Sequence, residues 1–321
     1  MKLGVFTCLL SDKSLDEALA YFSEKGIQMI EVGCGGYPGN SHANPDILLN
    51  DEKALETFKE TIQKYGLEIS ALSCHGNPVH PQKEIAKAFD ETIKKTILLA
   101  EKLGIHQINT FSGCPGDHEG AKYPNWVTCP WPEDFLAVLD YQWNEVLIPY
   151  WKETVAFAKV HGVNKIALEL HPGFAVYNTK SMLRLREAVG PEIGANLDPS
   201  HLFWQGMDPC LVIRELKDAI FHFHAKDTKI DTYNTALNGV LDTEHYGHIL
   251  NRSWVFRSVG YGHDYAVWKD IISTLRLVGY DYAISIEHED GLMSQNEGLT
   301  KAVEFLKQVL VYEETGQMWW A

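Results

Sequence analysis

Residues 165–171 read KIALELH, and Pro172-Gly173 follows them directly. Apolar residues at positions 166, 168 and 170 alternate with Ala167, Glu169 and His171. Successive side chains of a β-strand point to opposite faces, so this alternation predicts one apolar face and one face that carries a carboxylate and an imidazole. A carboxylate inside a core is costly unless another group balances its charge. The stretch therefore predicts a core strand that ends in a functional site.

Three later stretches repeat this pattern, at residues 195–201 (ANLDPSH), 221–227 (FHFHAKD) and 283–290 (AISIEHED). Their polar faces carry Asn196, Asp198 and Ser200 in the first stretch, His222, His224 and Lys226 in the second, and Ser285, Glu287 and Glu289 in the third. The opposite faces are apolar, as expected for strands covered by helices. Four strands whose ends supply Glu, Asp, His and Glu predict one metal site.

The whole chain alternates strands with helices. Eight strands are expected at residues 2–10, 29–33, 68–75, 106–112, 165–171, 193–198, 220–227 and 282–288. Helices are expected at 15–25, 51–65, 83–103, 133–160, 181–189, 209–218, 265–277 and 295–314. Strict alternation predicts parallel strands with right-handed crossovers, and eight units favour a closed barrel. The predicted fold is α/β, a (β/α)8 TIM barrel in a single domain over residues 1–321, with long loops at 113–132 and 228–264.

Composition limits the classes of partner. The net charge of −15 argues against nucleic acid and against an anionic membrane surface. Six cysteines without a C-x-x-C pair suit reduced thiols in a cytoplasmic protein. The opening MKLGVFTCLL is interpreted as the first strand, because its apolar run is short and no A-x-A-like cleavage site follows. No membrane span is expected, since no stretch approaches about 18 apolar residues.

Three carboxylates and one imidazole form a hard, oxygen-rich ligand set. Such ligands favour Mn²⁺, Mg²⁺ or Co²⁺ over a thiolate-type zinc centre, and Zn²⁺ stays open. Without a cation, inward carboxylates would repel one another and some would have to be protonated.

These strand ends resemble the xylose isomerase-like TIM-barrel family, which includes sugar isomerases, ketose 3-epimerases, inosose dehydratase and endonuclease IV-type enzymes. Within it, the set is similar to the single-metal isomerase and epimerase branch, over nearly the whole chain. The resemblance implies one divalent metal ion, Mn²⁺ first, bound by Glu169, Asp198, His224 and Glu287. It also implies that Glu169 and Glu287 act as acid and base on opposite sides of the substrate carbon.

The resemblance further implies that His201, shortly after the aspartate, contacts substrate. Family epimerases often have an arginine a few residues beyond the metal histidine, whereas this chain has Lys226 and Asp227 there and no arginine until Arg252. This departure argues against ketose 3-epimerase specificity and leaves the metal chemistry intact. Further expected substrate contacts are Lys226, His75, His171 and Trp126.

Structural alternatives exist for each residue. Asp198 can cap the turn that begins at Pro199, Glu169 can pair with a lysine inside the barrel, and Lys226 can be the salt-bridge partner of a site carboxylate. His222 suits the role of a hydrogen-bonded core histidine, because it lies one pair deeper than His224. Trp126 can simply hold its own loop in place.

The sequence therefore predicts a metal-dependent sugar isomerase or epimerase that moves a proton next to a carbonyl, with a small sugar or keto-sugar as substrate. The first alternative is a lyase of the same family, an inosose dehydratase-like or C-glycoside deglycosidase-like enzyme, the latter with a partner subunit. More remote alternatives are an endonuclease IV-like repair enzyme and a non-catalytic sugar-binding barrel. A homo-oligomer, dimer or tetramer, is expected, and we hypothesise that Trp319 and Trp320 dock on the barrel or on a subunit partner.

Overall fold

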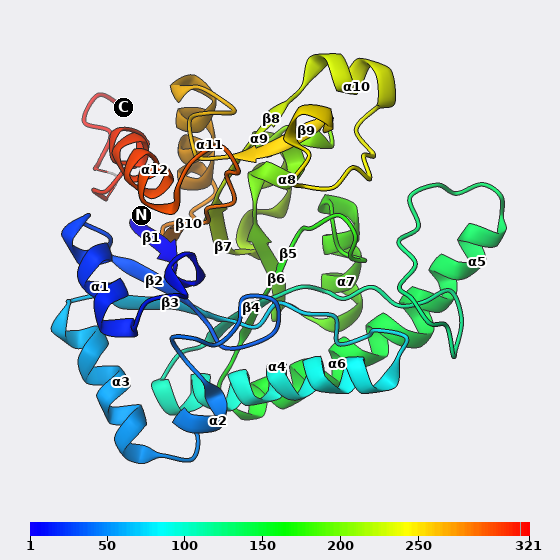
Figure 1. Cartoon of the computed structure of the whole chain (residues 1–321), viewed down its shortest axis with the longest axis horizontal. Coiled ribbons are helices and arrows are strands. Elements are labelled where there is room, and N and C mark those ends of the chain that lie inside the picture. The colour runs from blue at the N-terminus through cyan, green and yellow to red at the C-terminus, as the bar shows by residue number, and fades with distance from the viewer. Residues whose placement is uncertain (315) are drawn as a thin grey trace.

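Eight parallel strands close into a barrel in the computed structural model, which describes residues 1–314 and 316–321 (Figure 1). The strands are β1 (Lys2–Phe6), β2 (Met29–Gly33), β3 (Glu68–Ser73), β4 (Gln107–Thr110), β5 (Lys165–Glu169), β6 (Ile193–Leu197), β7 (Ile220–Ala225) and β10 (Ala283–Ile286). Each pairs with its neighbours in the closed order β1-β10-β7-β6-β5-β4-β3-β2. The predicted (β/α)8 barrel is confirmed.

Helices surround the barrel (Figure 1). They are α1 (Leu15–Glu24), α2 (Pro45–Leu48), α3 (Glu52–Lys64), α4 (Lys83–Leu103), α5 (Asp134–Asp140), α6 (Ile148–Val160), α7 (Thr179–Val189), α8 (Pro199–Trp204), α9 (Pro209–Leu216), α10 (Thr232–Asn238), α11 (Tyr265–Leu277) and α12 (Gln295–Val309). Short 3-10 turns occur at η1 (Thr7–Leu10), η3 (Lys217–Ala219) and η4 (Ile249–Asn251).

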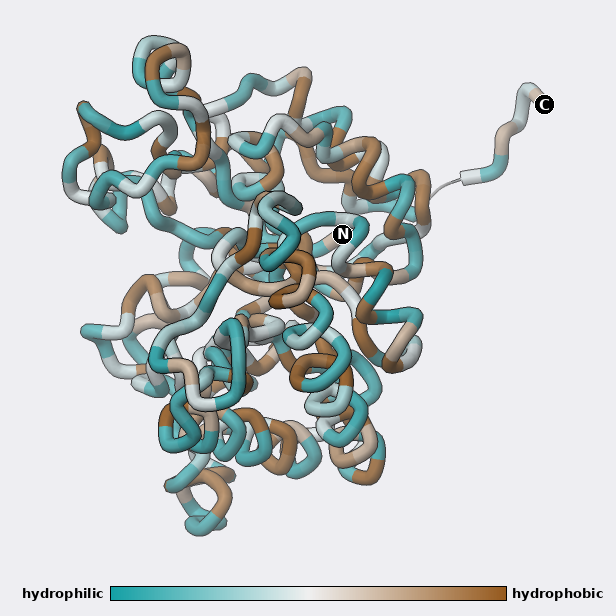
Figure 2. Tube along the Cα trace, turned by 90° about the vertical axis from the view of Figure 1, so that its right-hand side faces the viewer, coloured by the Kyte–Doolittle hydropathy of each residue, from teal (hydrophilic) through white to brown (hydrophobic). Residues whose placement is uncertain are grey.

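Local sequence explains where the helices begin and which face they bury. Ser14 and Glu17 form a capping box at the start of α1. In α3, Leu55, Phe58 and Ile62 are buried at helical spacing, and Asp51 caps the first turn. Apolar segments accordingly gather around the centre of the molecule in Figure 2.

Two expected elements differ in form. The first strand ends at Phe6, and residues 7–10 form η1. Phe6, Leu9 and Leu10 are all buried, and this spacing fits a helical turn better than a strand. Residues 134–160 are helical throughout, but η2 (Tyr141–Leu147) is a π-helix between α5 and α6. Pro149 has no N–H for a regular i→i−4 bond, and Ile148 N bonds to Trp143 O instead.

The expected loop 228–264 has structure of its own. The seventh barrel strand ends at Ala225, and β8 (Asp227–Ile230) pairs antiparallel with β9 (Trp254–Arg257). Trp254 and Phe256 on β9 are buried together with Trp204 of α8, and the Trp204 and Trp254 rings stack with centroids 4.5 Å apart. This small aromatic cluster holds the extra hairpin over the barrel mouth.

The cysteines and the C-terminal residues remain to be described. All six cysteines are free thiols. Among the described residues, no helix has the length and apolarity that crossing a membrane requires. Residues 316–321 stand apart from the barrel in Figure 2, and Trp319 and Trp320 are 89% and 69% exposed. The tail therefore does not dock on the barrel, and docking on a subunit partner stays a prediction.

Candidate metal centre

The four predicted ligands meet at the carboxyl end of the barrel. Each of Glu169, Asp198, His224 and Glu287 offers a ligand atom, and these atoms all lie within 4.8 Å of one another. Glu169 is the last residue of β5, Asp198 follows β6, His224 lies in β7, and Glu287 follows β10. His224 contacts both glutamates, because its Nδ1 lies 3.6 Å from Glu169 Oε2 and 3.2 Å from Glu287 Oε2.

Asp198 divides its two oxygens between two tasks. Oδ1 accepts a hydrogen bond from Ser200 N at 2.8 Å and so caps α8, as the structural alternative expected. Oδ2 is buried and finds no hydrogen-bond partner among the described residues. Lys226 Nζ lies 3.0 Å away as an ion pair, without the alignment of a hydrogen bond. Capping therefore leaves the second oxygen free for a cation.

Lys226 brings a positive charge into this group of carboxylates. Its side chain is 2% exposed, and Nζ donates to Glu287 Oε2 at 2.6 Å and to Glu289 Oε2 at 2.8 Å. The ammonium also lies over the Phe256 ring, 4.6 Å from its centre. Burial alone would lower the pKa of Lys226, but the neighbouring carboxylates raise it well above its usual value. The lysine thus stays charged and faces the cavity.

Glu31 of β2 is a functional candidate that the sequence analysis missed. It is fully buried and accepts hydrogen bonds from Ser73 Oγ, from Asn109 Nδ2 at 2.9 Å, from Ser285 Oγ at 3.0 Å, and from His224 Nε2 at 2.8 Å. A carboxylate that accepts one ring N–H of a histidine directs the other ring nitrogen outward. Glu31 therefore aims His224 Nδ1 at Glu169 and Glu287. The visible signal was a glutamate within the apolar strand MIEVG.

His222 belongs with Glu31 in a deeper set of polar groups. Its Nδ1 lies 3.1 Å from Asn196 Oδ1, and its Nε2 lies 3.1 Å from Ser70 Oγ. Burial lowers the pKa of His222 to about 4, so the ring is neutral near pH 7. This geometry matches the role of a hydrogen-bonded core histidine. We call Glu31, His222 and their partners Ser70, Asn109, Asn196 and Ser285 the lower layer.

The predicted substrate histidines surround Glu169. His201 Nε2 lies 3.1 Å from Glu169 Oε1, and His75 Nε2 lies 3.2 Å from Glu169 Oε2. The His171 ring is 4.0 Å from that of His201, and its Nδ1 donates to Pro172 O at 2.6 Å. Within the described residues, both nitrogens of His75 and Nδ1 of His201 lack a hydrogen-bond partner. We call the four predicted ligands together with His75 and His201 the upper layer.

A cavity of about 350 Å³ opens above the upper layer. Glu169, His171, Lys226 and Glu287 line its polar side, and aromatic residues including Phe6 and Phe111 line the rest. A volume near the lower end of the range for ligand sites suits a small molecule of sugar size. Trp126 does not line this cavity, since it lies against Tyr177 beside a different one.

The electrostatics fit a cation at this position. Burial raises the pKa of Asp198 to about 7, helped by the charges of Glu169 and Glu287 and opposed by Lys226. Burial also acts to raise the pKa of Glu287, but Lys226 and His224 lower it to about 2. Several carboxylates thus crowd around too few positive charges, and Asp198 Oδ2 has the ion pair with Lys226 but no hydrogen-bond partner among the described residues. A divalent ion would satisfy that oxygen and release the proton that Asp198 otherwise keeps.

Comparison with known proteins places this site in context. A family model for the xylose isomerase-like TIM barrel matches residues 19–309. The uncharacterized protein YfiH of Bacillus subtilis strain 168 is 40% identical over 312 residues, which are 97% of this chain and 99% of YfiH.

Two solved structures illustrate the structural match. The probable 3-DHS dehydratase AsbF of Bacillus anthracis, involved in petrobactin synthesis, has a TM-score of 0.64 at 18% identity, over 96% of this chain and 99% of AsbF. A D-psicose 3-epimerase in the presence of D-fructose has a TM-score of 0.64 at 13% identity, over 97% of this chain and 99% of that one. At such identities these matches show the shared fold.

Proposed function

The chain belongs to the xylose isomerase-like TIM barrel family, and on this premise we propose that it is a divalent-metal-dependent sugar isomerase or epimerase. The observation that carries the proposal is the convergence of four ligand atoms from four strands beneath a cavity of sugar size. The epimerase among the structural neighbours supports this class of reaction.

The residues that would hold the ion are Glu169, Asp198, His224 and Glu287. Three carboxylates and one imidazole suit Mn²⁺ best, with Mg²⁺, Co²⁺ and Zn²⁺ as alternatives. When bound, such an ion polarises a substrate carbonyl and makes the adjacent C–H more acidic. Glu31 orients His224 for this task, and the cap of α8 orients Asp198.

Glu169 and Glu287 would move the proton. Both have an oxygen within 3.6 Å of His224 Nδ1 and both line the cavity, so one can take a proton from the carbon next to the carbonyl while the other gives one back. Return to the opposite face of the same carbon inverts its configuration, and return to the neighbouring carbon gives an isomer. One proton leaves and one returns, so no other reactant is needed.

Substrate binding would rest on the groups that face the cavity. His75 lines the cavity and can bond to a sugar hydroxyl, whereas His201 lies outside the lining and contacts Glu169, so its expected substrate contact would be indirect. Lys226 and His171 line the cavity and offer a charged and a neutral polar group respectively. Phe6 and Phe111 offer apolar walls for the C–H surface of a sugar. Trp126 lies outside this cavity and is therefore not proposed as a substrate contact.

A lyase is the second candidate, because Lys226 places a proton-bearing ammonium in the same cavity. A glutamate would remove the proton next to the carbonyl and pass it to the β-oxygen substituent, whose negative charge the Lys226 ammonium would stabilise as it leaves, and a C=C bond would form. The dehydratase among the structural neighbours supports this alternative. The expected homo-oligomer and a separate partner subunit both stay predictions.

The experiment is incubation with Mn²⁺ in D₂O and a panel of ketoses, inososes and 3-keto-glycosides, followed by NMR. Deuterium next to the carbonyl together with a new stereoisomer or positional isomer supports the isomerase or epimerase. Release of water or of an aglycone moves the assignment to the lyase. Glu169→Gln and Glu287→Gln serve as controls, and turnover that survives both substitutions contradicts the proposal.

A further inference from the structure

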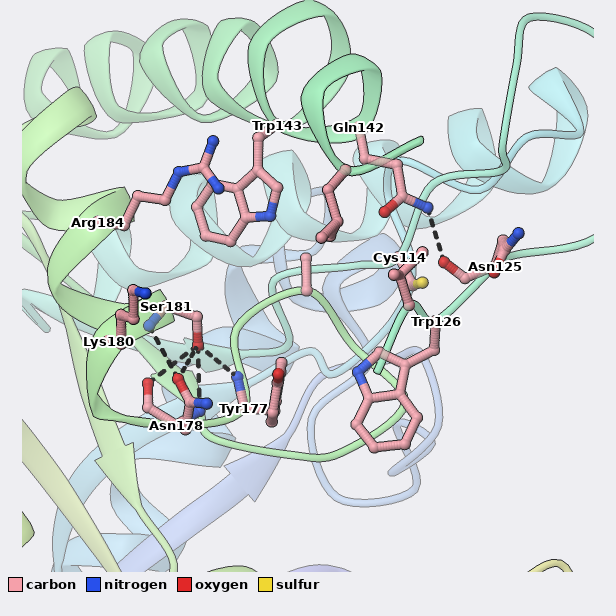
Figure 3. A pocket seen from close by; sticks show the side chains of 13 residues that line it. Cys114, Asn125, Trp126, Gln142, Trp143, Tyr177, Asn178, Lys180, Ser181 and Arg184 are labelled. Atoms are coloured by element: carbon pink, nitrogen blue, oxygen red, sulfur yellow. Dashed lines mark hydrogen bonds between the residues drawn. The ribbon is translucent and has the colours of Figure 1, made fainter. Parts of the chain in front are cut away.

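A second cavity of about 210 Å³ lies outside the catalytic cavity, bordered by the loop after β4, by η2 and by the start of α7 (Figure 3). Trp126 and Tyr177 meet edge to face there, with ring centres 5.3 Å apart. On another side the Arg184 guanidinium lies over the Trp143 ring at 4.2 Å, as Figure 3 shows. Trp126 and Tyr177 therefore offer aromatic surface to the cavity, whereas Arg184 covers one face of Trp143.

The charges at the mouth of this cavity are positive. Lys180 and Arg184 stand one helical turn apart on α7 and both line the cavity. Among the described residues that line it, none is Asp or Glu, although the whole chain has a net charge of −15. Asp140 lies outside the lining, and its carboxylate, which accepts a hydrogen bond from Asn144 Nδ2 at 2.7 Å, partly offsets the charge of Arg184. A local excess of cations in an acidic protein selects an anion.

Two further features indicate a built site. Gln142 Nε2 donates to the carbonyls of Pro115, Gly116 and Asn125, at 2.7–3.2 Å, and so fixes the loop that carries Trp126. Trp126 Nε1 is buried and has no hydrogen-bond partner within the described part of the chain. Buried donors are normally paired, so this indole N–H is an unsatisfied group in the wall of the cavity.

The segment 172–178 separates this cavity from the catalytic one. Phe174 stacks on Phe111 at 4.2 Å, and Phe111 lines the catalytic cavity. Ala175 and Tyr177 line the second cavity. Val176 N donates to Ser112 Oγ at 2.9 Å and anchors the segment between them. The two cavities are therefore neighbours with distinct walls, and ligands of one can be told from ligands of the other by substitution.

We infer that this second cavity binds a small single-ring carboxylate, with the ring against Trp126 and Tyr177 and the carboxylate at Lys180 and Arg184. The volume is below the roughly 300–1,000 Å³ of sites for drug-sized ligands, so one ring fits and two do not. This site is independent of the proposed reaction, since it contains none of the residues assigned to proton transfer or metal binding.

The test is isothermal titration of the full-length protein with benzoate, beside its neutral analogue benzamide and inorganic phosphate. We expect saturable benzoate binding with a Kd on the order of 1 mM or tighter. Lys180→Ala/Arg184→Ala should weaken it about tenfold or more, and Trp126→Phe severalfold. The charge-matched control Lys59→Ala/Lys152→Ala, with both lysines outside the cavity, should bind as the parent does.

Glu169→Gln separates the two cavities, because it alters the catalytic cavity alone and should leave benzoate binding unchanged. The inference is overturned if benzoate shows no saturable binding, if benzamide or phosphate binds equally well, or if the double substitution in α7 changes nothing. A cooperative thermal unfolding transition would establish that each variant is folded. None of these measurements depends on turnover, so failure of the proposed function would not affect them.

Discussion

The lower and upper layers of the barrel interior contain similar polar residues. Those of the lower layer have hydrogen-bond partners, whereas several of those in the upper layer do not. In the lower layer, Glu31 accepts four hydrogen bonds and His222 has a partner at each ring nitrogen. In the upper layer, His75, His201 and Asp198 carry buried polar atoms without hydrogen-bond partners among the described residues. Buried polar groups are normally paired. The fully hydrogen-bonded lower layer therefore fixes the positions of its side chains, and the unpaired atoms of the upper layer are available to a ligand.

The largest expected effect is on chemistry in the upper layer. Glu169→Gln removes the carboxylate that takes or returns the proton, so the rate of substrate deuteration should fall by about 10²–10⁴-fold. Stability should also fall, since His201, His75 and His224 hold the pKa of Glu169 well below its ordinary value and a neutral amide loses these charge interactions. Proton NMR in D₂O measures the rate, and thermal unfolding measures the stability. Near-parental deuteration by this variant would mean that Glu169 is not the acid or base.

A substitution in the lower layer should alter metal binding through the orientation of His224. Glu31→Gln weakens the hydrogen bond that directs His224, so the Mn²⁺ affinity should fall about 10–100-fold. Metal titration by calorimetry or by electron paramagnetic resonance provides a readout that needs no turnover. Unchanged affinity would show that Glu31 is a structural carboxylate without influence on the upper layer.

The pH dependence of metal binding should follow Asp198. Its pKa of about 7 in the folded chain lies above its ordinary value of 3.8, so the folded state holds a proton that the unfolded state has lost. The stability that Asp198 contributes to metal-free protein is therefore present below about pH 4 and lost as the pH rises through about 7. Mn²⁺ must displace the proton, so apparent affinity should fall about tenfold per pH unit below 7.

Calorimetry in buffers of different ionisation enthalpy measures this proton release. Asp198→Asn should abolish the release along with most of the affinity. An affinity that does not vary from about pH 5.5 to 7.5 would show that Asp198 is already ionised or is not a ligand.

The smallest expected effect distinguishes two serines of the lower layer. Ser285 Oγ donates to Glu31 and Ser70 Oγ contacts His222, and both serines are buried. Ser285→Ala should weaken Mn²⁺ binding severalfold through Glu31, whereas Ser70→Ala should leave it unchanged. Each should lower the unfolding free energy by about 1 kcal/mol, which chemical denaturation measures. Equal effects of the two substitutions on Mn²⁺ binding would contradict the claim that Ser285 acts through Glu31.

Sequence patterns predicted the barrel and the residues of the upper layer, because period-two alternation places Glu169, Asp198, His224 and Glu287 on inward faces near strand ends. Glu31 obeys the same rule, but it lies on a strand without a polar end and was passed over. The 3-10 turn after β1 and the π-helical segment η2 depend on packing and on Pro149, which alternation does not encode. Trp126 was expected near substrate, yet loop folding places it beside another cavity.

The most direct test of the central claim is the amount of Mn²⁺ that the purified protein binds at equilibrium. The account predicts one ion per chain, lost in Glu169→Gln/Asp198→Asn and retained in Trp126→Phe, which lies outside the catalytic cavity. Failure to bind Mn²⁺, Mg²⁺, Co²⁺ or Zn²⁺, or binding that the double substitution leaves intact, would contradict it.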